Sequence, residues 1–280
     1  MRWLVVFLMI PFLGLAQDDR HFVQQDPKFE YYLHQFAGTE DSGTGTPAPD
    51  EFFAFVGKLE AKKESFRNEH DFLKHLFTKT HQKFLVQYDA NASFQDLLKE
   101  GNYSCLTGTA LYALLLDHFN ADYRVVETNY HIFILADTEE GQILIEATDP
   151  ARGFIDARAE VEERISLYRR NELPAASAEK AYYRFSFEMF NEVNLDQMLG
   201  LLHYNLSIVD YNNHKLQDAI THLDKAMELY PSARMDEFAK ILLLTIHESQ
   251  LEVVEKESLI RKIHMMRKKK MASMASARAN

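Results

Sequence analysis

Hydrophobic residues recur at the three- and four-residue spacing of amphipathic helices along most of this chain. The pattern predicts one helix from residue 51, a second that begins at Asn68 and ends near Leu85, and a short third over residues 92–99. The strongest helical pattern covers residues 104–119, where the apolar positions are Leu106, Ala110, Leu111, Leu114, Leu115 and Phe119.

Strand-like runs occur only in the middle of the chain, directly after that helix. Three short runs rich in β-branched and aromatic residues predict strands over residues 124–127, 130–136 and 142–148. The segment DTEEG, which separates the second run from the third, is typical of a hairpin. Helices followed by a small antiparallel sheet predict an α+β fold for this half of the chain.

The second half of the chain returns to helical patterns. A charged helix is predicted over residues 156–170, and residues 182–190 carry five aromatic side chains that fit either a strand or a helix edge. Residues 195–230 look like a tetratricopeptide repeat. Its small–large–small positions, counted back from the closing proline, are Ala219, Leu223 and Ala226. A second helical pair is predicted over residues 235–249 and 251–266, and a plain helical bundle is the alternative.

The N-terminal residues add an expectation about the compartment. One basic residue, Arg2, precedes an apolar run over residues 3–15, and small residues stand at Gly14 and Ala16. This is the pattern of a secretory signal peptide cut after Ala16, with an uncleaved anchor as the alternative. We therefore expect an exported protein, periplasmic or secreted, with no stable membrane span after cleavage.

The charge balance narrows the classes of partner. The chain has 31 basic and 42 acidic residues and a formal net charge of −11. A nucleic-acid-binding protein usually presents a basic face, so we expect no nucleic-acid partner. The histidines lack the spacing of metal-binding motifs, and no metal or organic cofactor is expected.

Cys105 is the only cysteine of the chain. Exported proteins usually pair their cysteines, so an unpaired thiol is either buried and inert or reactive. Cys105 lies in the first turn of the predicted helix over residues 104–119. Unpaired N–H groups and the helix dipole at that position predict a lowered thiol pKa and a site for an oxyanion. A small cysteine packed inertly under the helix is the alternative.

A histidine and a carboxylate complete the candidate site. With a four-residue hairpin loop over residues 137–140, His131 lies directly opposite Glu146 and on the same face of the sheet. Glu146 would then orient the imidazole and stabilise its charged form, as the third member of a catalytic triad does. Asp149 is the alternative acid, but in this register it lies past the paired residues and on the opposite face.

These residues resemble the transglutaminase-like superfamily of cysteine enzymes, which is related in layout to papain-like proteases. The matched features are Cys105 on a helix, His131 followed by Ile-Phe, and Glu146 followed by Ala-Thr, within residues 50–155. The family usually has Asp at the acid position, Trp two residues after the histidine, and a glycine two residues before the cysteine. The resemblance implies a core of helices packed on a small antiparallel sheet and substrates that are peptide or side-chain amides.

The predicted organisation follows from these patterns. It comprises a signal peptide (1–16), an extension and loop (17–50), a transglutaminase-like core (51–160), a connecting segment (161–190), a helical region resembling tetratricopeptide repeats (191–267) and a basic tail (268–280).

The predicted activity is acyl transfer or hydrolysis through a Cys-His-Glu triad and a thioester, on a protein or peptide substrate. The helical region would offer a surface to a protein partner. The alternative is an inactive scaffold with the same fold that binds a partner.

Overall fold

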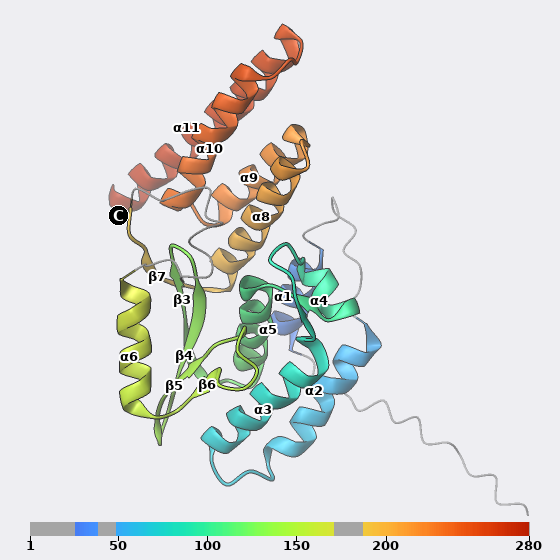
Figure 1. Cartoon of the computed structure of the whole chain (residues 1–280), viewed down its shortest axis with the longest axis vertical. Helices are drawn as coiled ribbons and strands as arrows, with labels where there is room; N and C mark the ends of the chain where they lie inside the picture. The colour runs from blue at the N-terminus through green and yellow to red at the C-terminus, as the bar shows by residue number, and fades with distance from the viewer. Residues whose placement is uncertain (1–25, 39–48, 171–186, 280) are drawn as a thin grey trace, which may run out of the picture.

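The computed structural model describes residues 26–38, 49–170 and 187–279, with side chains to residue 269. The predicted signal peptide, most of the loop before residue 50 and the aromatic residues 182–186 lie outside the described residues. The chain is a mixed α+β protein built from an α/β part and a set of C-terminal helices (Figure 1). None of the described helices is both long and apolar enough to cross a membrane.

A five-stranded antiparallel sheet forms the centre of the α/β part, with strand order β6-β5-β4-β3-β7. Its strands are β3 (Asp122–Thr128), β4 (Ile132–Thr138), β5 (Gly141–Ile145), β6 (Phe154–Ile155) and β7 (Phe190–Val193). The three predicted strands correspond to β3, β4 and β5. Strand β6 was not predicted, and β7 begins at the last of the residues 182–190, for which a strand or a helix edge was expected. The edge strand β7 spans the predicted boundary between the connecting segment and the helical region.

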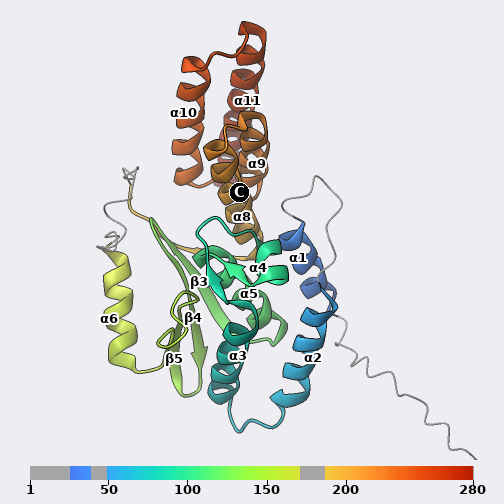
Figure 2. The same ribbon diagram turned by 45° about the vertical axis from the view of Figure 1, so that its right-hand side comes forward.

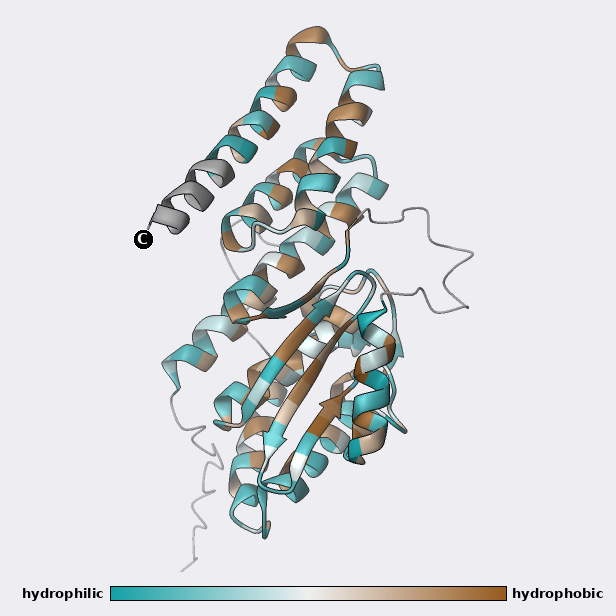
Figure 3. Cartoon of the chain, turned by 90° about the vertical axis from the view of Figure 1, so that its left-hand side faces the viewer, coloured by the Kyte–Doolittle hydropathy of each residue, from teal (hydrophilic) through white to brown (hydrophobic). Residues whose placement is uncertain are grey.

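Helices cover both faces of the sheet. Figures 1 and 2 show α5 (Cys105–His118) on one side of it and α6 (Arg158–Arg169) on the other. Ile132 and Ile134 of β4 belong to the core shared with α5, while the alternate residues Phe133 and Leu135 belong to a smaller core under α6. Because both faces are buried there, strands β4 and β5 are apolar along most of their length (Figure 3).

Further helices surround α5, and they match the predictions for residues 51–99. They are α2 (Asp50–Lys63), α3 (Glu69–Phe84) and α4 (Phe94–Glu100). The helix α3 begins as predicted, because Asn68 caps it by accepting a hydrogen bond from the backbone N–H of Asp71.

Helix α1 (Pro27–Ala37) was missed, although Asp26 caps it and Pro27 opens it. A short parallel pair, β1 (Gln87–Tyr88) and β2 (Asn102–Tyr103), leads into α5.

The C-terminal half consists of two consecutive helical pairs, as expected. They are α8 (Leu195–Asn212) with α9 (Leu216–Leu229), and α10 (Ala233–Glu248) with α11 (Val253–Ala279). The helix α11 continues past residue 266, where the sequence pattern had placed its end. These helices stand at one end of the sheet, next to the turn that joins β3 to β4 (Figures 1 and 2).

The predicted hairpin register is wrong by two residues. Thr138 pairs with Gly141 and Ile134 pairs with Ile145, so the loop contains two residues rather than four. Continued past β5, this register places Glu146 opposite Phe133 instead of His131. A shift of two keeps every side chain on its original face, so His131 and Glu146 remain diagonal neighbours on one face of the sheet.

Candidate functional site

Cys105 is the first residue of α5, and local capping fixes its position. Ser104 accepts a hydrogen bond from the backbone N–H of Thr107, and the Thr107 hydroxyl accepts one from the backbone N–H of Ser104. This reciprocal pair is a capping box, which satisfies two of the backbone donors that a helix start leaves unpaired. The thiol therefore lies at a well-defined helix N-terminus, as the sequence predicts.

Cys105 and His131 line the same cavity, which has a volume of about 280 Å³. The cavity lies between the start of α5, the β3–β4 turn and the C-terminal helices. Its other lining residues are Leu106, Glu127, Asn129, Tyr130, Ile132, Leu201, Tyr204, Asn205 and Arg234. Helices α8 and α10 thus supply part of its wall. The described residues include no hydrogen bond between the sulfur and the imidazole.

His131 is held by Glu146 on one side and by its own turn on the other. Its Nε2 donates a hydrogen bond to Oε2 of Glu146. Because a carboxylate only accepts, Nε2 carries the proton, and Nδ1 is the basic nitrogen of the neutral imidazole. The backbone N–H of His131 donates to the Thr128 hydroxyl at 3.0 Å, and its carbonyl oxygen accepts from the Thr128 N–H at 2.8 Å. These bonds fix the turn from which the imidazole projects.

Glu146 is buried, with 3% of its surface exposed, and both of its oxygens are occupied. Its Oε1 accepts from the N–H and the hydroxyl of Thr148, at 3.2 and 2.8 Å. Its Oε2 accepts from Tyr168 of α6 at 2.8 Å as well as from His131. Burial by itself raises the pKa of this carboxyl, but the bond and charge of His131, with the bonds from Thr148 and Tyr168, outweigh it and lower the pKa. The carboxylate is therefore anionic at neutral pH.

Asp149, the alternative acid, forms hydrogen bonds within its own turn and not with His131. Its Oδ1 accepts from the backbone N–H groups of Ala151 and Arg152, at 3.2 and 2.9 Å. Its backbone carbonyl accepts from the Gly153 N–H at 2.8 Å. Asp149 thus stabilises the turn after Glu146, and the structure brings Glu146, not Asp149, to the imidazole.

The expectation of a lowered Cys105 pKa is wrong. Burial, followed by the nearby negative charge of Glu146, raises the pKa of the thiol to about 11. The backbone N–H groups of Leu106 and Cys105 and the charge of Arg234 act in the opposite direction, but they are weaker. The helix start does favour an anion, as predicted, yet desolvation exceeds that effect. The Cys105 thiol is therefore protonated at neutral pH.

Sequence reasoning missed the contacts that come from distant elements. Tyr168 lies on a charged helix whose pattern gave no sign of a site. Arg234 follows the repeat-like pattern and donates to the carbonyl oxygens of Thr128 and Asn129, at 2.7 and 3.2 Å. No local sequence feature indicates that Arg234 contacts a turn about one hundred residues earlier in the chain.

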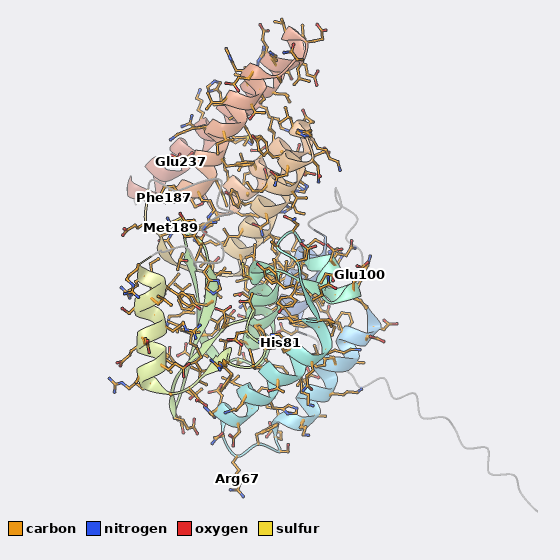
Figure 4. All side chains as sticks on the ribbon, viewed as in Figure 1. Arg67, His81, Glu100, Phe187, Met189 and Glu237 are labelled. Carbon is orange, nitrogen blue, oxygen red and sulfur yellow. The ribbon has the colours of Figure 1, made fainter. Side chains whose placement is uncertain are left out.

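Several of the other histidines in the described part of the chain have structural partners. His81, labelled in Figure 4, donates from Nε2 to the carbonyl oxygen of Ala147 at 3.0 Å. The Nδ1 atoms of His203 and His222 lie 3.3 Å apart between α8 and α9. Among the described residues, no three or more His, Cys, Asp or Glu side chains are grouped in a way that would hold a metal ion.

Comparison with known proteins yields no relative. No protein-family model matches the chain, and neither a curated protein nor a solved structure does. The resemblance to transglutaminase-like enzymes therefore rests on the order and chemistry of Cys105, His131 and Glu146.

Proposed function

We propose that this chain is a transglutaminase-like cysteine enzyme that transfers or hydrolyses acyl groups of peptide or side-chain amides. One observation carries the proposal. His131 lines the cavity that also contains Cys105, and it is held by a buried carboxylate through Nε2, so that Nδ1 is left as a base. Nucleophile, base and orienting acid are the three parts that thiol catalysis requires.

In the first step, the sulfur of Cys105 attacks the amide carbonyl carbon while Nδ1 of His131 takes the thiol proton. Because the thiol is neutral at rest, this proton transfer accompanies attack instead of preceding it. The carbonyl oxygen becomes an oxyanion, for which the N–H groups at the start of α5 are the donors. Glu146 stabilises the imidazolium that forms.

The second step returns that proton. The imidazolium donates it to the leaving amine as the carbon–nitrogen bond breaks, which leaves a thioester on Cys105. Water gives hydrolysis and a second amine gives transfer; in both cases His131 takes a proton from the attacking group and the thiol is regenerated. If the predicted signal peptide is used, the substrates are proteins or peptides of the cell envelope or the exterior.

The proposal is tested with acyl donors that need no knowledge of the natural substrate. The purified protein is mixed with p-nitrophenyl acetate, or with a glutamine-containing peptide and a primary amine, and adducts are followed by intact mass. Cys105 is the only cysteine, so a thioester identifies its own position. We expect Cys105 to be acetylated, and His131→Ala to slow acetylation by at least about 100-fold, the usual contribution of a general base.

Asp149→Asn serves as the matched control, because Asp149 lies at the same end of the sheet but bonds only to its own turn. It should leave acetylation within about twofold of the parent, whereas Glu146→Gln should slow it strongly. Equal acetylation rates in the parent and His131→Ala would contradict the proposal.

The scaffold alternative has its own supporting observation. The raised thiol pKa and the lack of a sulfur–imidazole hydrogen bond among the described residues fit a cavity that binds without reacting. A scaffold would show slow acetylation that is independent of His131.

A further inference from the structure

The turn that carries His131 is anchored from the C-terminal helices. Nη2 of Arg234, at the start of α10, donates to the carbonyl oxygens of Thr128 and Asn129, at 2.7 and 3.2 Å. These are the residues that leave β3 and enter the turn before His131. The guanidinium therefore bonds directly to the backbone from which the imidazole projects.

A buried carboxylate holds Arg234 in place. Nε of Arg234 lies 3.0 Å from Oε1 of Glu127, which is the last but one residue of β3 and is 2% exposed. Tyr230, at the end of α9, donates to Oε2 of the same carboxylate at 2.8 Å. We call Glu127, Tyr230 and Arg234 the turn anchor. Its charges are paired across the boundary between the sheet and the helices. A planar guanidinium can donate to a carboxylate and to two carbonyl oxygens at once, which a lysine ammonium does less well.

A second contact fixes the same turn. The Asn129 side chain donates to the carbonyl oxygen of Phe187 and accepts from the backbone N–H of Met189 at 2.6 Å. Figure 4 labels Phe187 and Met189 at the end of the sheet that faces the C-terminal helices. The turn is thus held both by the segment that leads into β7 and by α10, and within the turn the Thr128 hydroxyl donates to the carbonyl oxygen of His131 at 3.1 Å.

We propose that Arg234 is a positioning residue for His131, so that the C-terminal helices are part of the site and not an appended binding module. The proposal rests on the function proposed above, since it assigns His131 a partner in the cavity. Arg234 also lines that cavity with Cys105, so movement of α10 alters both the imidazole and the wall over the thiol. Misplacing a catalytic group by about 1 Å can slow a reaction about 100-fold.

The test uses the full chain with the double substitution Glu127→Gln and Arg234→Met. It removes both bonds to the turn carbonyls without leaving a buried charge unpaired, a fault that would threaten folding in Arg234→Met alone. Tyr230→Phe is a graded variant, because it removes the hydroxyl that donates to Glu127 and accepts from Asn191 but keeps Arg234 on the turn. Lys240→Ala removes an exposed ion pair elsewhere on α10 and controls for unrelated effects.

Two readouts are measured on each folded variant, with circular dichroism as the check on folding. The first is the NMR signal of the His131 Nε2 proton, which reports the bond to Glu146. The second is the rate of Cys105 acetylation. We expect the double variant to shift or broaden the proton signal and to slow acetylation at least tenfold, with Tyr230→Phe between the double variant and the parent and Lys240→Ala near the parent.

An unchanged His131 signal in the folded double variant would overturn the proposal, whatever the acetylation rate. If the parent itself shows no His131-dependent acetylation, the proposed function fails. In that event the proton signal still decides whether Arg234 positions His131.

Discussion

The two sides of the cavity are built in different ways. Cys105 is placed by its immediate neighbours, through the capping box of Ser104 and Thr107 at the start of α5. His131 is placed by residues far along the chain, among them Tyr168, through Glu146, and Arg234, through the turn. One side is local and the other is assembled only when the sheet, α6 and the C-terminal helices come together.

The two sides also differ in charge. Burial keeps the thiol neutral, whereas four hydrogen bonds keep Glu146 ionised beside the imidazole. The negative charge of the site therefore lies on Glu146 and not on Cys105. Substitutions on the Cys105 side should therefore affect only the start of α5. Substitutions on the His131 side should also affect the sheet and the helices that contact it.

The largest expected effect comes from Gly153→Ala, on the His131 side. An added Cβ would overlap the backbone carbonyl oxygens of Glu146 and Asp149, and backbone atoms cannot move aside cheaply. The Gly153 carbonyl also accepts from the Glu146 N–H at 2.7 Å. We expect a loss of about 3 kcal/mol in the free energy of unfolding, the upper range for overpacking, measured by urea denaturation.

Gly108→Ala makes the same chemical change on the Cys105 side. Its added Cβ would approach side-chain atoms only, the closest being the Ala147 Cβ at 3.0 Å. Helix propensity favours alanine by about 1 kcal/mol and offsets part of that crowding. If Gly153→Ala is no more destabilising than Gly108→Ala, the contrast between the two sides is wrong.

A pH effect should identify the neutral thiol. The pKa of Cys105 is about 11 in the folded chain, against an ordinary value of 9.0. Above pH 9 the unfolded chain therefore loses the thiol proton before the folded chain does. Stability then falls as pH rises from about 9 to about 11, by up to about 3 kcal/mol, since each pKa unit corresponds to about 1.4 kcal/mol. Cys105→Ala should lack this component when unfolding curves of the two proteins are compared across that range. Parallel curves would show that the thiol is not desolvated.

Glu146→Gln tests the ionised side of the site. The folded pKa of Glu146 is lowered from 4.5, so its contribution is present above that value and disappears as pH falls through the folded pKa. We expect the substitution to cost about 2 kcal/mol at pH 7, in the range for hydrogen bonds to a charged group. The difference from the parent should shrink in acid. A cost that does not vary with pH would mean that the carboxyl is not ionised in the folded state.

The smallest expected effect is that of Ser104→Ala, which removes the cap of α5. Loss of an N-cap costs about 1 kcal/mol, and thermal unfolding would register it. The NMR signal of the His131 ring should stay unchanged, since the side-chain hydrogen bonds of Ser104 in the described part of the chain stay at the start of α5. A shifted ring signal would show that the two sides are coupled through α5.

Local signals account for what the sequence predicted correctly about the fold. Caps at Asn68 and Ser104 and apolar residues at helical spacing identify α3 and α5, because both signals depend on residues within one or two helical turns. Helix α1 carried the same signals, Asp26 and Pro27, and was missed because it follows a polar segment. The two-residue strands β1, β2 and β6 carry too few residues for a pattern to appear.

The site was predictable only in part, because some of its features depend on residues that are distant in the sequence. Residue order singled out Cys105, His131 and Glu146, and the face shared by the last two survived a register error because that error was an even number of residues. The direction of the thiol pKa was not predictable, since it depends on how deeply packing buries the sulfur. Tyr168 and Arg234 were not predictable either, since only the folded chain brings them to the site.

The most direct test of the central claim is the pH dependence of Cys105 alkylation by iodoacetamide in the parent and in His131→Ala. If thiol and imidazole act together, the parent shows an alkylation phase well below the thiol step near pH 11, and His131→Ala loses that phase but keeps the step. Superimposable profiles with the single step near pH 11 would contradict the claim and leave Cys105 as an unassisted thiol.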